Sequence, residues 1–274
     1  MNDLIKLGKF NYINVVPVYH DLEKYLPKNC CTLNEGPPAV LNAALADEVL
    51  DLSPVSAFAY ALYHDKWHIV PDISISCTGN VISVLLVSDL KFEELDKKKI
   101  LLTNESASAA SLLRILFFEK NIYPKFYSGD IHKLDKNEYD AALVIGDNAL
   151  LTDWTKKFTN VYDLGKSWFE LTNLPFVFGL WAVSKKAYEK NKNKIHEIKD
   201  VLIENKKRNL DCLDEISIIS AKRKNTTKEF MANYFKTIEY DLSEKKIEGL
   251  KLFYSLLHRH KLLTDKIIPE FIKG

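Results

Sequence analysis

Polar residues at three predicted helix starts are the first candidates for chemistry in this sequence. Asn14 lies shortly before Pro17, Ser56 follows a strand-like run, and Ser106 with Ser108 precedes a long apolar segment. The first N–H groups of a helix have no partner inside it, so with Ser or Asn side chains they form a pocket for an anion. Each residue also has the type of an ordinary helix N-cap. Three such starts favour a ligand that carries carboxylates.

One acid and a group of aromatic residues leave two interpretations open. Asp147 follows a strand-like run at 141–145, so its carboxylate is predicted either to point at a ligand or to cap the next helix. Aromatic residues near the second apolar strand either form the wall of a site for an unsaturated ring or pack a hinge. These residues are Trp168, Phe176, Phe178 and Trp181.

Several motifs of cofactor and metal chemistry are missing from the sequence. The nine glycines never form G-x-G-x-x-G or G-x-x-x-x-G-K, which disfavours nucleotide cofactors. No H-E-x-x-H or G-x-S-x-G motif occurs, and His64 and His68 are interpreted as surface or packing residues rather than ligands. The four cysteines lack C-x-x-C spacing, which favours reduced thiols. The missing motifs therefore argue against a nucleotide cofactor and against a metal site.

The elements that position these residues are short strands alternating with helices. Strands are predicted near residues 4–9, 33, 49–52, 81–87, 99–102, 141–145 and 175–183. Helices are predicted from Pro17 to about Leu26, from Pro37, at 56–64, 106–120 and 147–157, and in a lysine-rich region at 185–210, 227–236 and 243–260. Such alternation is typical of α/β folds with mostly parallel sheets flanked by helices.

The two apolar strands at 81–87 and 175–183 are interpreted as paired hinges. Lobe one is then predicted to be discontinuous, 1–84 plus 180–274, and lobe two to be 85–179. This is the two-lobed topology of the periplasmic-binding-protein type II fold. We expect a ligand cleft between the lobes, lined by strand ends and helix starts.

The amino-acid composition argues against two classes of partner, nucleic acids and membranes. Lys plus Arg number 38 against 37 Asp plus Glu, and the lysines are scattered, so no nucleic-acid partner is expected. The sequence has no run of about 18 apolar residues, so no membrane partner is expected. Residues 1–10 lack the apolar core of a signal peptide, which predicts a cytoplasmic protein.

A series of motifs begins with GKFNYINVVP at 8–17 and continues with blocks at 35–42, 51–56, 74–79, 103–108, 141–147, 162–165 and 174–182. This series, which covers about residues 4–184, resembles the chorismate dehydratase family of the futalosine route to menaquinone. Cys77, Ala57 and Ala109 depart from residues frequent in the family. The C-terminal helices carry no family signature.

The resemblance implies an enzyme, a cofactor-free hydro-lyase that removes water from chorismate to give 3-[(1-carboxyvinyl)oxy]benzoate. Among the residues of the matching blocks, Asn14 is expected to position the ring hydroxyl or the side-chain carboxylate of the substrate, with Asp147 as an orienting group. Expected substrate-binding residues are Ser56 and Ser76 in lobe one and Ser106, Ala107 and Ser108 in lobe two.

The general base is left open at this point. The acids of the matching blocks are Asp147, Asp51 and Glu105, and the substrate's own enolpyruvyl carboxylate is the alternative that has been proposed for the family. Three rival functions share the expected architecture: a solute-binding protein for a small carboxylate, the related 1,4-dihydroxy-6-naphthoate synthase, and a ligand-sensing domain.

Overall fold

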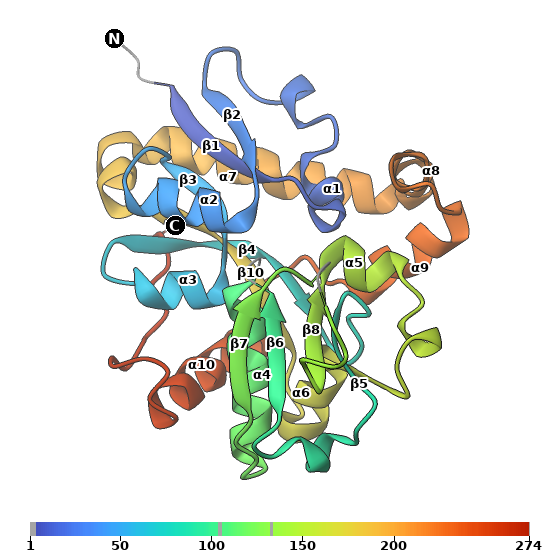
Figure 1. Ribbon diagram of the computed structural model, residues 1–274. Helices are drawn as coiled ribbons and strands as arrows, with labels where there is room; N and C mark the ends of the chain where they lie inside the picture. Colours follow the sequence, from blue (N-terminus) through green and yellow to red (C-terminus); the bar gives the residue numbers. More distant parts are fainter. Residues whose placement is uncertain (1–3, 104–105, 132–133, 274) are drawn as a thin grey trace. The chain divides into compact units, whose positions relative to one another are not determined.

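The computed structural model describes residues 4–103, 106–131 and 134–273, and it divides into two compact units (Figure 1). Unit one comprises Met1–Ser76, Val177–Ser243 and Ile268–Gly274, and unit two comprises Cys77–Phe176 and Glu244–Ile267. Among the described residues, no helix combines the length and the apolar character that crossing a membrane requires.

Unit one is built on a five-stranded sheet in the order β2-β1-β3-β10-β4. Its strands are β1 (Ile5–Phe10), β2 (Cys31–Gly36), β3 (Leu52–Ser56), β4 (Trp67–Cys77) and β10 (Phe176–Ser184). β1 is parallel to β2 and β3, whereas β10 is antiparallel to β3. The carboxyl ends of β1, β2 and β3 therefore lie at one edge of this sheet.

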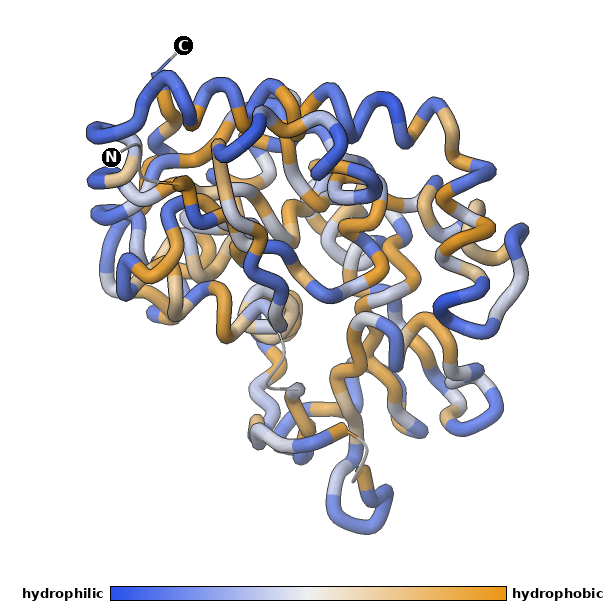
Figure 2. The backbone as a smooth tube through the Cα atoms, turned by 90° about the horizontal axis from the view of Figure 1, so that it is seen from above, coloured by the Kyte–Doolittle hydropathy of each residue, from blue (hydrophilic) through white to orange (hydrophobic). Residues whose placement is uncertain are grey.

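Six helices and two 3-10 turns complete unit one. They are η1 (Ile13–Val15), α1 (Val16–Tyr19), η2 (Leu22–Lys24), α2 (Pro38–Ala46), α3 (Ala57–Leu62), α7 (Lys185–Asp211), α8 (Leu213–Lys224) and α9 (Lys228–Thr237). The long helix α7 buries Ile195, Ile198 and Leu202 on one face, as the helical period requires. In Figure 2, hydrophilic and hydrophobic residues alternate along the helical turns, the pattern of helices with one buried face.

Unit two is built on a second five-stranded sheet, in the order β7-β6-β8-β5-β9. Its strands are β5 (Val84–Ser88), β6 (Lys99–Thr103), β7 (Lys125–Gly129), β8 (Ala141–Ile145) and β9 (Asn160–Asp163). Its helices are η3 (Phe92–Leu95), α4 (Ala107–Glu119), α5 (Gly146–Leu151), η5 (Trp154–Lys156), α6 (Leu164–Thr172) and α10 (Glu244–Arg259). β6 is parallel to β7 and β8, and β5 runs antiparallel to β8 and β9.

One face of the second sheet carries a hydrophobic cluster. Ala142 and Val144 point to the same face because side chains alternate along a strand, and they pack with Val87 and Leu101 of the neighbouring strands. Trp154, after α5, covers this cluster. The buried cluster makes β8 a rigid support for the turn that follows it.

The α/β fold with two mixed sheets confirms the predicted fold class, and the strand at 141–145 is confirmed as β8. The helix predicted from Pro17 to Leu26 is wrong in length. α1 ends at Tyr19 because its C-cap His20 is extended, with ψ of 127°, and Asp21 then adopts the left-handed conformation, with φ of 56°. The strand predicted at 49–52 lies later, at β3, because Glu48 also has positive φ and turns the chain there.

The division into units differs from the predicted one at the C-terminal helix. The prediction placed all of 180–274 in lobe one, whereas Glu244–Ile267, which contains α10, belongs to unit two. The ring of Phe253 packs edge-on against Phe176 at 5.0 Å between centroids. A Cβ on Gly249 would lie 2.2 Å from the Pro175 carbonyl oxygen, so glycine permits this close approach of α10.

Candidate active site

The carboxyl edge of the first sheet gathers the predicted residues of unit one. Asn14 lies just after β1, and Ser56 ends the parallel strand β3. The Lys185 N–H donates to the Lys66 carbonyl, so β4 starts where β10 ends, and Ser76 near the other end of β4 lies toward the same edge as Ser56. The structure therefore brings Asn14, Ser56 and Ser76 to one edge of the sheet.

Asn14 has an unsatisfied acceptor. Its side chain is half-buried in η1, and its Oδ1 is shielded from solvent with no hydrogen-bond partner among the described residues. A buried acceptor without a donor destabilises the folded state by about 1–3 kcal/mol, which is why such atoms are rare unless a ligand supplies the partner. This orphan oxygen makes Asn14 the clearest candidate for a ligand contact in unit one.

The segment that carries Asn14 is fixed from behind by two buried asparagines of α7. Asn205 Nδ2 donates to the carbonyls of Val18 and His20 at 2.9 and 2.8 Å. Asn209 Nδ2 donates to the carbonyls of Pro17 and His20 at 3.0 and 2.9 Å. These bonds satisfy carbonyls at the end of α1, which a helix of this length leaves free. Sequence reasoning missed both residues, since they lie in a helix without family motifs.

A second set of bonds ties the same segment to the sheet. Tyr19 Oη donates to the Gly8 carbonyl at 2.8 Å and accepts from Trp181 Nε1 at 2.9 Å. Burial raises the pKa of the Tyr19 phenol well above its usual range, so this group is neutral at physiological pH. Trp181 is fully buried in this network and cannot form the wall of a ligand site.

The two serines of unit one differ in what their hydroxyls leave available. Ser56 is the N-cap of α3, and its Oγ accepts from the Ala59 N–H at 3.1 Å while its proton has no acceptor among the described residues. Ser76 is 1% exposed, and its hydroxyl donates to the Glu239 carbonyl at 3.0 Å. Ser56 thus keeps a donor for a ligand, whereas the proton of Ser76 is used within unit one.

The carboxyl edge of the second sheet carries the start of α4. Ser106 is its N-cap and accepts from the Ala109 N–H at 3.2 Å. Ala107 is exposed and Ser108 is fully buried in the first turn of this 13-residue helix. Their backbone N–H groups are the first donors of the helix and lie at the positive end of its dipole. Asn104 and Glu105 of the same motif lie outside the described residues.

Asp147 lies at the same edge, because β8 is parallel to β6. Gly146 starts α5 with φ of 57°, a conformation that favours glycine, and its N–H donates to the Ser83 carbonyl at 2.8 Å. Ile145 is the N-cap and makes no side-chain cap bond, so Asp147 belongs to the first turn and is not the cap. The half-buried Asp147 carboxylate is therefore held beside the start of a helix.

Asp163 organises a connection that sequence reasoning did not identify. It ends β9 and caps α6 through the Lys166 N–H at 3.0 Å. The same carboxylate accepts from the N–H groups of Val81 and Ile82, the latter at 2.7 Å. Ile82 is β-branched and has φ of 54°, so its backbone is strained and Asp163 holds it in place.

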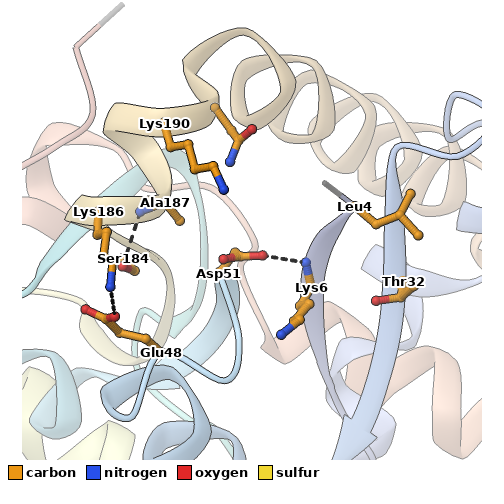
Figure 3. Close-up of a pocket in the computed structure, with 10 residues that line it drawn as sticks. Leu4, Lys6, Thr32, Glu48, Asp51, Ser184, Lys186, Ala187 and Lys190 are labelled. Carbon is orange, nitrogen blue, oxygen red and sulfur yellow. Dashed lines mark hydrogen bonds and ion pairs between the residues drawn. The ribbon is translucent and has the colours of Figure 1, made fainter. Parts of the chain in front are cut away.

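Asp51 was considered as an acid of the site, and its position argues against that role. It directly precedes β3, so it lies at the opposite edge of the first sheet from Ser56. Its carboxylate accepts from the Lys6 N–H at 2.8 Å. It lines a cavity of about 590 Å³ with Lys6 and Thr32 near the amino ends of β1 and β2, with Glu48, and with Lys186 at the start of α7 (Figure 3). Glu48 in the same cavity is paired with Lys186.

The aromatic residues near 175 pack the interior of unit two. Trp168 and Phe176 are 0% and 1% exposed, and Trp168 Nε1 donates to the Pro175 carbonyl at 3.2 Å. Their rings meet edge-on at 5.2 Å between centroids. Of the two interpretations left open by the sequence, packing holds for Trp168, Phe176 and Trp181.

Cysteine and histidine side chains build no reactive centre in the part of the chain that the structure describes. The four cysteines are free, as predicted. Burial and the adjacent Cys30 raise the pKa of the Cys31 thiol to about 12, so this thiol is protonated and a poor nucleophile. His64 contacts the Ala61 carbonyl at 3.0 Å, and the described residues contain no group of three or more His, Cys, Asp or Glu placed to bind a metal.

Comparisons with known proteins agree with these observations. A model of a family described as menaquinone biosynthesis matches residues 5–259. A chorismate dehydratase of Thermus thermophilus is 30% identical over 268 residues, which cover 92% of this chain and 94% of that protein. A chorismate dehydratase of Campylobacter jejuni is 29% identical over 245 residues, covering 82% of this chain and 95% of that protein.

A solved structure shows the fold class. The periplasmic aliphatic sulphonate binding protein of Escherichia coli superposes with a TM-score of 0.68 at 15% identity, covering 99% of this chain and 94% of that chain. The periplasmic-binding-protein fold expected from the sequence is thereby confirmed. The family match and the two similar dehydratases show that the chain belongs to the chorismate dehydratase family.

Proposed function

We propose that this protein is a hydro-lyase that removes water from chorismate and releases 3-[(1-carboxyvinyl)oxy]benzoate. Family membership supports this reaction. The main structural support is the buried Oδ1 of Asn14, which has no hydrogen-bond partner among the described residues and is available to a ligand. The carboxyl edges of both sheets, where α/β proteins bind their ligands, hold the residues that we assign to the substrate.

The chemistry needs donors more than a strong base. Loss of the C3 proton and the C4 hydroxyl makes the substrate ring aromatic, which supplies much of the driving force. Charge develops on the ring carboxylate as the C3 proton leaves, so fixed N–H and O–H donors at that group stabilise the transition state more than the ground state. We assign this carboxylate to the start of α4, formed by Ser106 and the N–H groups of Ala107 and Ser108.

Asn14 is assigned to the hydroxyl that leaves. The sequence left two roles open, the ring hydroxyl or the side-chain carboxylate. The orphan Oδ1 accepts from a hydroxyl, whereas the Nδ2 of the same amide can donate to a carboxylate, and we make the assignment on the orphan acceptor. Asn14 then holds the C4 hydroxyl in the orientation required for its departure.

The two serines of unit one are assigned according to whether the hydroxyl proton is available to the substrate. Ser56 has a hydroxyl proton to give to the substrate. Ser76 is a weaker assignment because its proton already binds the Glu239 carbonyl. Asp147 is kept as an orienting group at the start of α5. The enolpyruvyl carboxylate of the substrate is assigned as the base that takes the C3 proton and passes it to the departing C4 hydroxyl, so that water leaves and the carboxylate is regenerated.

The test is direct incubation of purified protein with chorismate in the presence of EDTA and without added cofactor. Ultraviolet absorbance follows aromatisation and mass spectrometry identifies the product. We expect the loss of one water per chorismate. Chorismate that binds tightly but returns unchanged would overturn the proposal and indicate a binding protein of the same fold.

A further inference from the structure

A second cavity of unit one lies apart from the residues assigned to the substrate. It has a volume of about 340 Å³ and lies between the segment after β1 and helix α8. Its lining includes Tyr12, Val15 and Val16 but not Asn14, Ser56 or Ser76. The mechanism proposed above gives this cavity no role.

One lining residue, Ser220 of α8, has an unsatisfied hydroxyl. The residue is 1% exposed, and its Oγ has no hydrogen-bond partner among the described residues. A helical serine ordinarily donates to the carbonyl four residues earlier. Ser217 of the same helix does so, to Leu213 at 2.7 Å, whereas Ser220 does not. Because Ser220 lines the cavity, its hydroxyl is left to bind a ligand oxygen there.

A second lining residue, Arg223, is a cation without a carboxylate. Lys9 is paired with Glu35 at 3.1 Å and Lys24 with Asp21 at 2.6 Å. Arg223 makes no ion pair within the described residues, and its guanidinium contacts only the Asn11 carbonyl, at 3.4 Å. Asp21 and Glu23 line the same cavity but make no ion pair with Arg223. A guanidinium without an ion pair to a described acid is suited to bind a carboxylate through two parallel hydrogen bonds.

The rest of the lining combines charged and apolar residues. Lys9, His20, Asp21, Glu23 and Lys24 also line the cavity, and Asp21 is paired with Lys24. Phe10, Leu22, Leu33 and Ile219 contribute hydrocarbon surface to the cavity. The volume is at the lower end of the range for small-molecule sites, about 300–1,000 Å³. These dimensions suit a ligand with one ring or a short aliphatic chain.

We propose that this cavity is a second binding site, for a small monocarboxylate with an aromatic or aliphatic body. Arg223 receives the carboxylate, Ser220 donates to it, and the apolar residues enclose the body. Because Tyr12 and Val15 flank Asn14, occupancy restrains the segment that presents Asn14. By linkage, this ligand and the substrate change each other's affinity by the same factor. Only this coupling rests on the proposed function; the site itself does not.

Calorimetric titration with phenylacetate tests the site, with phenylacetamide as the neutral control of the same shape. We expect phenylacetate to bind and the amide to bind about tenfold more weakly, because it lacks the charge that Arg223 recognises. Arg223→Gln is expected to raise the Kd about tenfold, and Ser220→Ala about threefold. The matched control Lys222→Gln changes an exposed neighbour that does not line the cavity, and its Kd stays that of the wild type.

Two results overturn the proposal. One is the absence of phenylacetate binding, or binding that Arg223→Gln leaves intact. The other is binding that Asn14→Ala removes, which places the probe in the proposed substrate site instead. A crystal soaked with 4-iodophenylacetate locates the ligand independently through the anomalous signal of iodine, and we expect that signal beside α8. Failure of chorismate dehydration alone leaves these binding results unchanged, so the two proposals are tested separately.

Discussion

The carboxyl edges of the two sheets offer different groups to a ligand. In unit one the groups left for a ligand are on side chains, the acceptor Asn14 Oδ1 and the hydroxyl of Ser56, and the segment that carries Asn14 is fixed by buried asparagines of α7. In unit two the groups are backbone donors at helix starts, with Ser106 and Asp163 as the caps of α4 and α6. An acceptor suits a hydroxyl and backbone donors suit an anion, which is the basis on which we propose their roles.

The largest effect is expected when the acceptor of unit one is removed. The Asn14→Ala variant should dehydrate chorismate much more slowly than the wild type. Removing one preorganised polar contact at a reacting group lowers kcat by about 10²–10³-fold. The folded protein is expected to lose no stability, because the substitution removes a buried acceptor that has no donor. Steady-state kinetics on chorismate and thermal unfolding measure the two effects.

The matched control for Asn14→Ala is Asn11→Ala. Asn11 lies three residues earlier, is exposed, and makes no side-chain hydrogen bond in the described part of the chain. We expect its kcat to stay close to that of the wild type. A folded Asn14→Ala protein with full activity would remove Asn14 from the site and leave unit one without its main assigned residue.

The next largest effect is expected on the stability of unit two, when the Asp163 carboxylate that caps α6 is removed. Asp163→Ala leaves the N–H groups of Val81, Ile82 and Lys166 without their acceptor. A hydrogen bond to a charged group contributes about 1.5–3 kcal/mol. Because three such bonds to one carboxylate are lost together and water replaces part of them, we expect the free energy of unfolding to fall by about 2–4 kcal/mol. Urea unfolding followed by circular dichroism measures the loss.

Asp153→Ala is the control for Asp163→Ala. Asp153 is also in unit two, and its carboxylate contacts Thr155 and Lys156 at the surface. Exposed pairs of this kind contribute about 0–1 kcal/mol, so its loss of stability is expected to be small. Equal losses in the two variants would show that the Asp163 contacts hold nothing in place.

The same contrast explains what the sequence predicted and what it did not. Local signals located Asn14, Ser56 and Ser106, because a polar residue before an apolar helix is visible within a few positions. Asp163 was missed because its partners, Val81 and Ile82, lie about 80 residues earlier in the chain. A carboxylate that binds distant backbone groups leaves no pattern in its own neighbourhood.

The sequence did not predict β7, β9 and α6, and it also missed β4 and α8, for which a local reason is clear. β4 is the 11-residue strand Trp67–Cys77, and Pro71 in its middle argues against a strand in the sequence. α8 was missed because its apolar pair, Ile218 and Ile219, faces solvent, so the periodicity of a buried helix face is weak. The ligand cleft expected between the lobes stays a prediction.

The smallest expected effect compares the two serine caps. Ser56→Ala and Ser106→Ala each remove an N-cap bond, which lowers stability by about 1 kcal/mol in either unit. The substitution Ser106→Asp separates the two roles of Ser106. A carboxylate also accepts from the Ala109 N–H, so the cap of α4 is kept. The same carboxylate places a negative charge where we assign the ring carboxylate of chorismate. We therefore expect Ser106→Asp to keep the stability of the wild type and to raise KM by about tenfold or more, through like-charge repulsion. Steady-state kinetics and thermal unfolding of the same preparations separate the two roles, since a residue that only caps α4 would give Ser106→Asp an unchanged KM.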